Sequence, residues 1–403
     1  MSGRTVAIAI SRARPALGAL VATRTGALLT AGAGWLYLVA GQSGAPDQLV
    51  PLARTFLAGR LYLADPMPWL ELIPRVGGGW YVPFPPIPSL LFVPILWLFP
   101  GLAFDTCLAA AIAGAVSVLL IWRILGQLGL AFRPRLALAA GYALGSELVW
   151  VAAVGGPHLW VQVVGETFLL GVLTLALERR WPILGGALFA AASVGARLPI
   201  IGAAPLLLGL YAGFRWSGLR GRDVRRFVLG ALPIAAAVAW YNLARFGSPL
   251  EFGYGPLIAS DPWFPHGLLS PLYLPRGLYA LLFQGFGFVD QFPWLKPGWT
   301  GEAVTFTMPV VLMLWQARSR EPFVILSWAA IAAILLPDLT HGSWGFAQYG
   351  YRFVLDALPI IWLLLAWIVR REGLGHGTAI LLGLGVAAQL YGLVAIWVLR
   401  FVS

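Results

Sequence analysis

The chain is dominated by apolar runs long enough to cross the hydrocarbon core of a bilayer. These runs recur from about residue 26 to the last residues of a 403-residue chain. A transmembrane helix needs about 20 mostly apolar residues. The whole chain carries only 16 Asp and Glu residues, and its charged fraction of 11% is too small to cover a soluble surface. The sequence therefore excludes a soluble enzyme and predicts an all-α integral membrane protein.

The apolar runs predict a helical bundle of about eleven crossings in a single domain that covers residues 1–403. One further apolar run, 85–98, is shorter than a crossing and contains four prolines. The predicted crossings are 22–42, 106–128, 134–153, 158–178, 181–196, 198–214, 226–246, 303–317, 321–337, 353–369 and 377–399.

The basic residues decide how the run 85–98 lies. If it does not cross, 18 of the 27 Lys and Arg residues fall on the inner side; if it crosses, only 10 do. Cytoplasmic loops carry an excess of Lys and Arg, so the first arrangement is favoured. It makes 85–98 a re-entrant or interfacial helix and places the N-terminus in the cytoplasm. The 18 residues are Arg4, Arg12, Arg14, Arg24, Arg123, Arg133, Arg135, Arg179, Arg180, Arg215, Arg220, Arg222, Arg225, Arg226, Arg318, Arg320, Arg370 and Arg371.

The outer side carries the features expected of a working surface. Twelve of the 16 acidic residues fall on the outer side or in its half of the membrane, and the two long loops, 43–105 and 247–302, are both outer loops. The first loop opens with an amphipathic pattern that begins at Leu49 and predicts a helix lying in the interface, with Asp47 as its N-cap. We therefore expect the active face to be extracytoplasmic, on a multi-pass protein of the inner membrane.

Several classes of chemistry are disfavoured by what the sequence lacks. It has no GxxxxGK, HExxH or DxD motif, which argues against a nucleotide-bound donor. The net charge of +11 comes from short basic clusters between apolar runs, so we expect no nucleic-acid partner. The single Cys107 allows neither an internal disulfide nor a thiolate metal site.

Polar residues inside apolar runs are candidates for a site, because an ionisable group is costly in the membrane. His158, Gln162 and Glu166 recur every four residues and so share one helix face. They either line a polar groove entered from outside or bond neighbouring helices. Arg197, between two short crossings, either binds an anionic head group or extends to the interface.

Two outer segments combine aromatic rings with arginine. They are WYNLARFGSPLEFGYG, which ends at Gly255, and HGSWGFAQYGYRF, which begins at His341. Aromatic rings with a nearby arginine suit a sugar phosphate, since the guanidinium can bond phosphate oxygens. The alternative is an aromatic belt at the head-group level. The candidate residues in these segments are Tyr254, Tyr349 and Arg352.

At these residues the chain resembles the GT-C fold glycosyltransferases. The resemblance is to the lipid-carrier-dependent enzymes related to protein O-mannosyltransferases and to the aminoarabinose transferases of lipid A. It runs from about residue 25 to 370, and YNLARFGSPLEFGY is its most specific stretch. The other matching stretches are DQLVPLAR with Asp47 and Arg54, YVPFPPIPSLLFV with Tyr81, SVGARLP with Arg197, and SWGFAQYGYRFVLDALP with Arg352.

The resemblance implies transfer of a sugar from a polyprenyl-phosphate donor to an acceptor hydroxyl of a glycan, lipid or protein, with inversion. Asp47 is then the general base, and Arg352 stabilises the departing phosphate, with Arg197 or Arg276 as alternates. The sugar, the acceptor and any need for a divalent metal stay open. A transporter or lipid flippase is the alternative class, since polar residues within the membrane also describe a translocation path.

The topology is tested by cysteine labelling in intact cells. We expect Arg133→Cys to be shielded from a membrane-impermeant reagent and Ser89→Cys to lie on the outer side, because the 18-to-9 charge split fixes the orientation. Labelling of Arg133→Cys from outside is the result that contradicts this orientation.

Overall fold

The computed structural model describes residues 16–41, 47–67, 70–215, 221–259 and 261–400. Arg4, Arg12, Arg14 and Arg220, which enter the predicted charge split, lie outside the described residues. The described part is mostly helical, as the apolar runs predict, and its strands form only two short hairpins.

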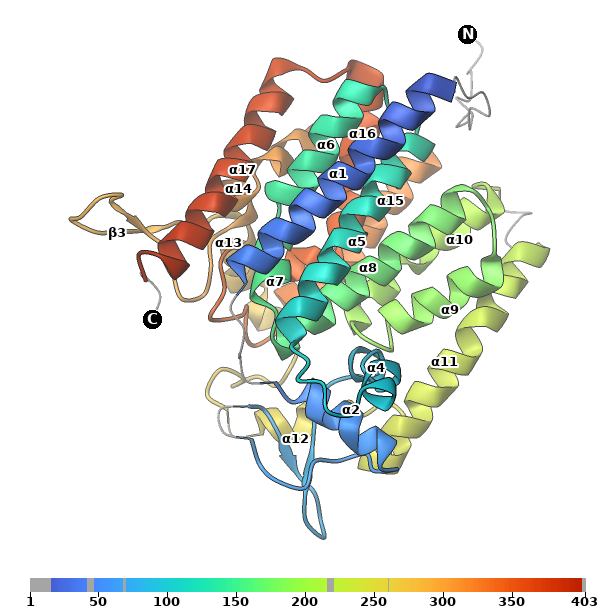
Figure 1. Cartoon of the computed structure of the whole chain (residues 1–403), viewed down its shortest axis with the longest axis vertical. Helices are drawn as coiled ribbons and strands as arrows, with labels where there is room; N and C mark the ends of the chain where they lie inside the picture. The colour runs from blue at the N-terminus through green and yellow to red at the C-terminus, as the bar shows by residue number, and fades with distance from the viewer. Residues whose placement is uncertain (1–15, 42–46, 68–69, 216–220, 260, 401–403) are drawn as a thin grey trace.

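The bundle is an array of helices that run roughly along the long axis of the molecule (Figure 1). Its elements are α1 (Ala16–Ala40), α5 (Thr106–Gln127), α6 (Phe132–Leu144), α7 (Leu148–Val154), α8 (Pro157–Leu177), α9 (Pro182–Ala192), η1 (Leu198–Ala203), α10 (Ala204–Ala212), α11 (Arg222–Phe246), α14 (Val304–Thr307), η4 (Pro309–Gln316), α15 (Pro322–Leu339), η5 (Arg352–Asp356), α16 (Leu358–Glu372) and α17 (His376–Trp397).

Five helices of the described residues are long and apolar enough to cross a membrane: α5, α8, α11, α15 and α17. The pair α6 and α7, bent by 46°, makes a sixth if it is one broken crossing. These helices identify a membrane protein, whereas the count of eleven crossings stays a prediction. At the expected crossing 303–317 the chain instead forms α14 and the 3-10 helix η4. The α-helix ends at Thr307, with Met308 as its C-cap, because Pro309 has no amide hydrogen to continue it.

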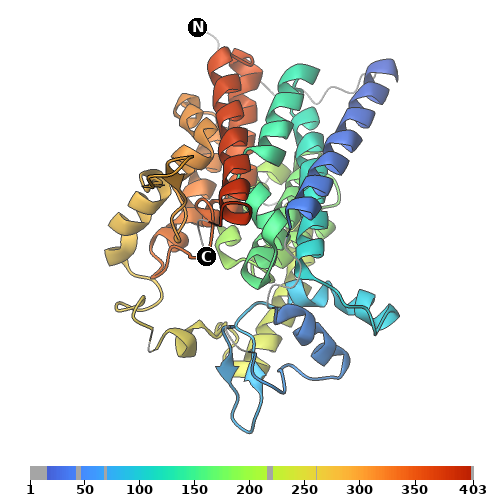
Figure 2. The ribbon, with the colours of Figure 1, turned by 60° about the vertical axis from the view of Figure 1, so that its left-hand side comes forward.

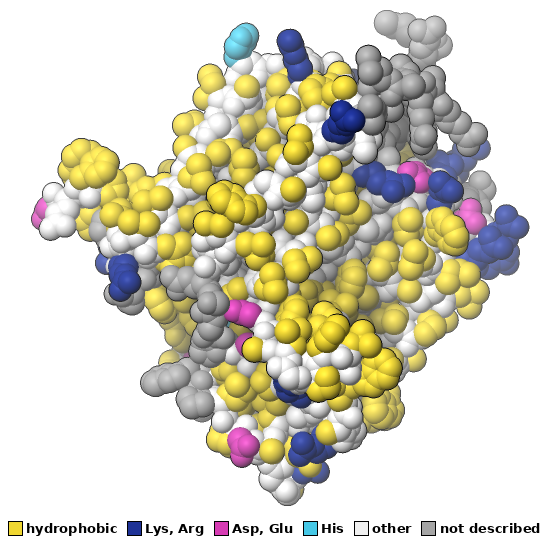
Figure 3. Space-filling model, viewed as in Figure 1, with side chains coloured by type: hydrophobic (Ala, Val, Ile, Leu, Met, Phe, Trp, Pro, Cys, Tyr) yellow, Lys and Arg dark blue, Asp and Glu magenta, His cyan; other side chains and the backbone are white. Residues whose placement is uncertain are grey.

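Two helices in the centre of the bundle are buried over most of their surface. Most residues of α8 are buried, including Gln162 and Glu166 of its polar face, and α16 buries Trp362 and its Leu and Ile side chains. A helix that is largely apolar needs burial on most of its faces. Outside this core, hydrophobic side chains cover most of the visible face of the bundle (Figure 3).

A separate group of short elements gathers at one end of the bundle, here called the loop end (Figures 1 and 2). It contains α2 (Leu49–Leu57), α3 (Ile87–Leu90), α4 (Val93–Leu98), α12 (Tyr254–Ile258) and a hairpin of β1 (Ile73–Pro74) and β2 (Trp80–Tyr81), paired Ile73 to Tyr81 and Pro74 to Trp80. The remaining elements are η3 (Pro271–Tyr273), α13 (Leu274–Leu282) and the hairpin of β3 (Gly287–Phe288) and β4 (Leu295–Lys296).

The run 85–98 forms two short helices, α3 and α4, that pack against α2 at the loop end. Neither is long enough to cross a bilayer. The ring of Phe92 stacks on Trp160 of α8 at 5.3 Å, and the Trp160 indole donates to the Pro88 carbonyl at 3.1 Å. The Ser89 side chain is fully buried here, so exposed Val76 at the tip of the β1–β2 hairpin is the better position for outer labelling.

Helices α9 and α11 cross so closely that two glycines are required. A Cβ atom on Gly186 would collide with the Phe227 carbonyl, and one on Gly230 with the Ile183 carbonyl. Backbone atoms cannot move aside as a flexible side chain can, so the two helices would have to separate.

We expect Gly186→Ala to lower the thermal stability of the purified protein in detergent by about 1–3 kcal/mol, because the added methyl overpacks the crossing. Gly383→Ala is the matched control: it lies within α17 with nothing within 4 Å of the added Cβ. Equal melting temperatures for the two variants would show that the crossing is not tight.

Candidate functional site

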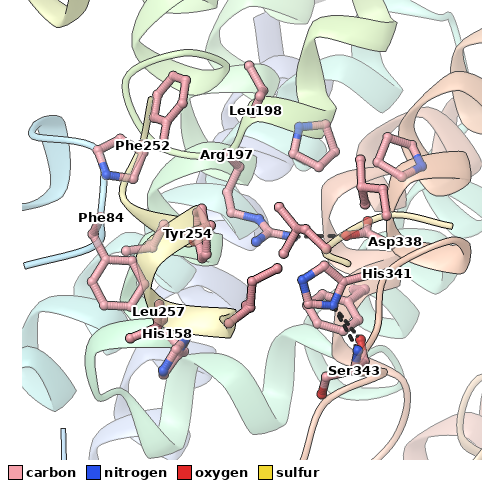
Figure 4. A pocket seen from close by; sticks show the side chains of 18 of the residues that line it. Phe84, His158, Arg197, Leu198, Phe252, Tyr254, Leu257, Asp338, His341 and Ser343 are labelled. Atoms are coloured by element: carbon pink, nitrogen blue, oxygen red, sulfur yellow. Dashed lines mark hydrogen bonds and ion pairs between the residues drawn. The ribbon is translucent and has the colours of Figure 1, made fainter. Parts of the chain in front are cut away.

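A large cavity lies where the helical bundle meets the loop end (Figure 4). Its volume is about 970 Å³, which is the size of a small-molecule site. The wall combines one face of α8, the α9–η1 junction, the segment 250–269, the end of α15 and the segment 341–353. Its polar side chains include Glu71, His158, Gln162, Arg197, Glu251, Tyr254, Asp261, Asp338, His341 and Arg352.

Arg197 at the α9–η1 junction holds two acidic side chains from distant parts of the chain. Its Nη2 lies 2.6 Å and its Nε 2.9 Å from Oδ2 of Asp356, and Nη2 lies 3.5 Å from Oδ1 of Asp338. Asp356 is fully buried and Asp338 nearly so. Figure 4 shows the Arg197 side chain reaching across the cavity towards Asp338. The structure therefore places Arg197 in an internal ion pair rather than at the interface.

Arg352 lies in the same wall but has no such partner. Only 9% of it is exposed, and its buried Nε has no hydrogen-bond acceptor. Among the described residues, no carboxylate lies within ion-pair distance of its guanidinium. Burial lowers the pKa of Arg352, and the nearby charge of Arg197 lowers it further, but arginine still stays protonated at neutral pH. The cavity wall thus contains an arginine that forms no ion pair with any described carboxylate.

Glu71 and His158 form a second polar pair in the cavity wall. Oε2 of Glu71 lies 3.6 Å from Nε2 of His158, and each side chain is about one-third exposed. The ring of Phe84 packs edge-on against His158 at 4.9 Å. Burial raises the pKa of Glu71, while the positive charge of Arg352 opposes the rise. A carboxylate with a raised pKa is suited to accepting a proton.

Tyr254 and His341 add neutral polar groups to the wall. Burial raises the pKa of Tyr254 to about 12, so its hydroxyl keeps its proton at neutral pH. Burial lowers the pKa of His341 and favours the uncharged imidazole. Nδ1 of His341 donates to the Ser343 carbonyl at 2.7 Å in the tautomer that carries its proton there, and this contact fixes the ring at the cavity edge (Figure 4).

The face predicted on α8 is only partly directed to the cavity. His158 and Gln162 line it, whereas Glu166 is fully buried between helices. Glu166 accepts hydrogen bonds from Ser117 of α5, at 3.2 Å, and from Tyr142 of α6. Of the two roles considered for this face, Glu166 therefore has the packing role.

Asp47 and Arg54 are placed outside the cavity wall. The carboxylate of Asp47 accepts from the amides of Leu49 at 2.8 Å and Val50 at 3.1 Å, so it caps α2 as the sequence predicts. Arg54 donates to the carbonyls of Pro100 and Leu102 and ties α2 to the chain beyond α4.

Three other predicted residues also lie away from the cavity wall. Tyr81 packs against Phe246 at 5.3 Å. Arg276 lies over the Trp344 ring at 4.4 Å and donates to the Gly342 carbonyl. Tyr349 is fully buried, and its hydroxyl donates to the Ala388 carbonyl of α17 at 2.5 Å. Of the residues predicted to bind substrate, the cavity brings together His158, Gln162, Arg197, Tyr254 and Arg352.

Three acidic residues of the site were not predicted from the sequence: Glu71, Asp338 and Asp356. Asp356 falls inside the predicted crossing 353–369, where an acidic residue needs a partner. The position of Asp356 in an apolar run was therefore a signal in the sequence that it belongs to a site. Glu71 offered none, because nothing in its loop indicates which side chain it meets.

No group of three or more His, Cys, Asp or Glu side chains in the described ranges is arranged to hold a metal ion. Comparison of the chain with protein-family models, with curated proteins and with solved structures found no match.

We expect Asp356→Asn to destabilise the protein by about 3 kcal/mol, because it removes the closer of the two buried carboxylates that compensate Arg197 and leaves only Asp338, at 3.5 Å. Thermal unfolding in detergent measures the loss. The control is Glu321→Gln, which breaks the exposed pair with Arg371 and should cost at most about 1 kcal/mol. Similar losses for both variants would mean that the buried pair does not hold the site together.

Proposed function

We propose that the protein is a membrane glycosyltransferase that moves a sugar from a polyprenyl-phosphate donor to an acceptor hydroxyl. The single observation that carries this proposal is the buried, unpaired guanidinium of Arg352 in the wall of a large cavity. An uncompensated buried charge is costly, and the phosphate of a donor would compensate it through charge-assisted hydrogen bonds.

The rest of the cavity wall is compatible with a lipid-linked donor. Leu198 and Ile201 of η1 line the cavity and are about half exposed, beside Pro337 of α15. These apolar side chains suit an isoprenoid chain lying next to the phosphate. The resemblance to lipid-carrier-dependent enzymes at SVGARLP includes the same junction. It therefore supports the same class of donor as the apolar lining does.

In the proposed reaction the acceptor oxygen bonds to the anomeric carbon and loses its proton to a carboxylate. The bond between that carbon and the phosphate oxygen breaks, and the phosphate leaves with the electron pair. Arg352 stabilises the charge on the phosphate, with Tyr254 as a neutral hydrogen-bond donor. Two carboxylates compete for the role of base. The family resemblance favours Asp47, and we favour Glu71, which lines the cavity while Asp47 caps α2.

The position of Glu166 weighs against the alternative of a transporter or flippase. A translocation path would continue the polar face of α8 inward from His158 and Gln162. Glu166, the next member of that face, is instead enclosed by α5 and α6. We also propose that the loop end faces the extracytoplasmic side of the inner membrane, as the positive-inside rule favours.

The donor assignment is tested in proteoliposomes. We expect transfer from a polyprenyl-phosphate sugar and none from sugar nucleotides, and Arg352→Ala should reduce donor use by about 10- to 150-fold, the equivalent of one charge-assisted bond. Arg75→Ala, on the exposed β1–β2 turn, is the control and should leave activity unchanged. Efficient transfer from a nucleotide sugar by the purified protein contradicts the proposal.

The base is identified by comparing Glu71→Gln with Asp47→Asn. We expect Glu71→Gln to lower turnover by about 10²- to 10⁴-fold, whereas Asn still caps a helix and should preserve most activity. The base form of Glu71 is lost as the pH falls through its raised pKa. Turnover should therefore decline at a higher pH than for an ordinary glutamate. The opposite ranking of the two variants would assign the base to Asp47.

A further inference from the structure

The segment 271–299 exposes an unusual number of large apolar side chains. It runs from η3 through α13 and the β3–β4 hairpin, and its charged residues are only Arg276, Asp290 and Lys296. Its apolar side chains with more than half of their surface exposed are Leu272, Tyr279, Phe283, Phe288, Phe292, Trp294 and Trp299. Phe288 is 86% and Phe292 76% exposed, values that a water-facing loop rarely combines.

Two contacts fix the level of this segment along the bundle. Gly277 of α13 lies directly against Leu339, the last residue of α15. Beyond α13, the Tyr391 hydroxyl of α17 donates to the Leu295 carbonyl of β4 at 2.5 Å. Tyr391 precedes the end of α17 by six residues, or about 9 Å along a helix. The hairpin is thus attached within the length of α17 and not beyond its end.

Both views of the ribbon agree with this placement. The hairpin and α13 lie beside the helices, while α2, α12 and the β1–β2 hairpin lie beyond them at the loop end (Figures 1 and 2). In the space-filling view the hairpin projects sideways from the bundle and is mostly hydrophobic (Figure 3). Leu336 of α15 and Val394 of α17, on the two helices that hold the segment, are also about half exposed.

We propose that residues 271–299 form a collar that lies in the lipid interface of the leaflet on the loop side. Its partner is the phospholipid boundary between head groups and acyl chains. A two-stranded hairpin leaves edge backbone groups unpaired, which excludes the hydrocarbon core. Exposed Phe and Trp side chains exclude bulk water, and aromatic residues are enriched at this boundary. The sequence had assigned the whole of 247–302 to an outer loop.

The collar is joined directly to the cavity wall. The amide of Ser270, just before η3, donates to the Thr340 carbonyl at 2.8 Å, and Leu269 forms a β-bridge with His341. Arg276 of the collar donates to the Gly342 carbonyl. Seating the collar in the interface therefore sets the depth of the cavity edge relative to the bilayer. This inference does not depend on the reaction proposed above.

Site-directed fluorescence quenching tests the collar. In a Cys107→Ala background, which removes the only native cysteine, a fluorophore is attached at Phe292→Cys or at Val76→Cys. Val76 is 97% exposed on the other hairpin and is the matched control. The protein is reconstituted in phosphatidylcholine and phosphatidylglycerol vesicles with a lipid that carries a nitroxide near its head group.

We expect the lipid quencher to act at least about twofold more strongly at position 292 than at 76, and aqueous iodide to show the reverse order. Equal iodide quenching at both positions overturns the proposal. Protection of position 292 from both quenchers also overturns it and indicates a protein partner. Hydroxyl-radical labelling of the unmodified protein in nanodiscs gives a second measurement. Trp294 should be protected relative to Trp263 of the cavity segment, and equal oxidation of the two contradicts the collar.

Discussion

The buried ion pair between Arg197 and Asp356 is the interaction on which the rest of the site depends. It joins the α9–η1 junction to η5 in an apolar bundle, and Asp338 brings the end of α15 to the same guanidinium. A buried charge without a partner is far more costly than a paired one, so this contact fixes how the three segments meet. The space between them becomes the cavity. Because Arg197 engages both aspartates, Arg352 is left as the cation available to a ligand.

The cavity wall is assembled from two parts of the structure. Arg352, Arg197 and His158 come from the helical bundle, whereas Glu71 and Tyr254 come from the elements at the loop end. Stacking of Phe92 on Trp160 holds the loop end against α8.

The four-residue spacing on α8 shows how far a local pattern can be followed. It predicted one shared face and left two roles open for it, and the structure divides them: His158 and Gln162 line the cavity, whereas Glu166 bonds the neighbouring helices. A helix turns by about 100° per residue, so eight residues leave Glu166 about 80° around the helix from His158. That rotation is enough to turn the side chain from the cavity towards α5 and α6. Similarly, the aromatic and arginine segment 341–353 supplied Arg352 to the site, while its Tyr349 turned to α17.

The membrane class, the helical architecture and the helix α2 with its Asp47 cap could be predicted from the sequence alone. These features follow from composition and short-range periodicity, which every segment carries within itself. The pairing of the charged side chains could not be predicted, because it depends on contacts between distant segments. Arg197 and Asp356 are 159 residues apart, and the 3.6 Å contact of Glu71 with His158 joins a loop to a helix. The sequence does not distinguish an arginine that forms a buried ion pair from one that does not. That difference arises only when the whole bundle has packed.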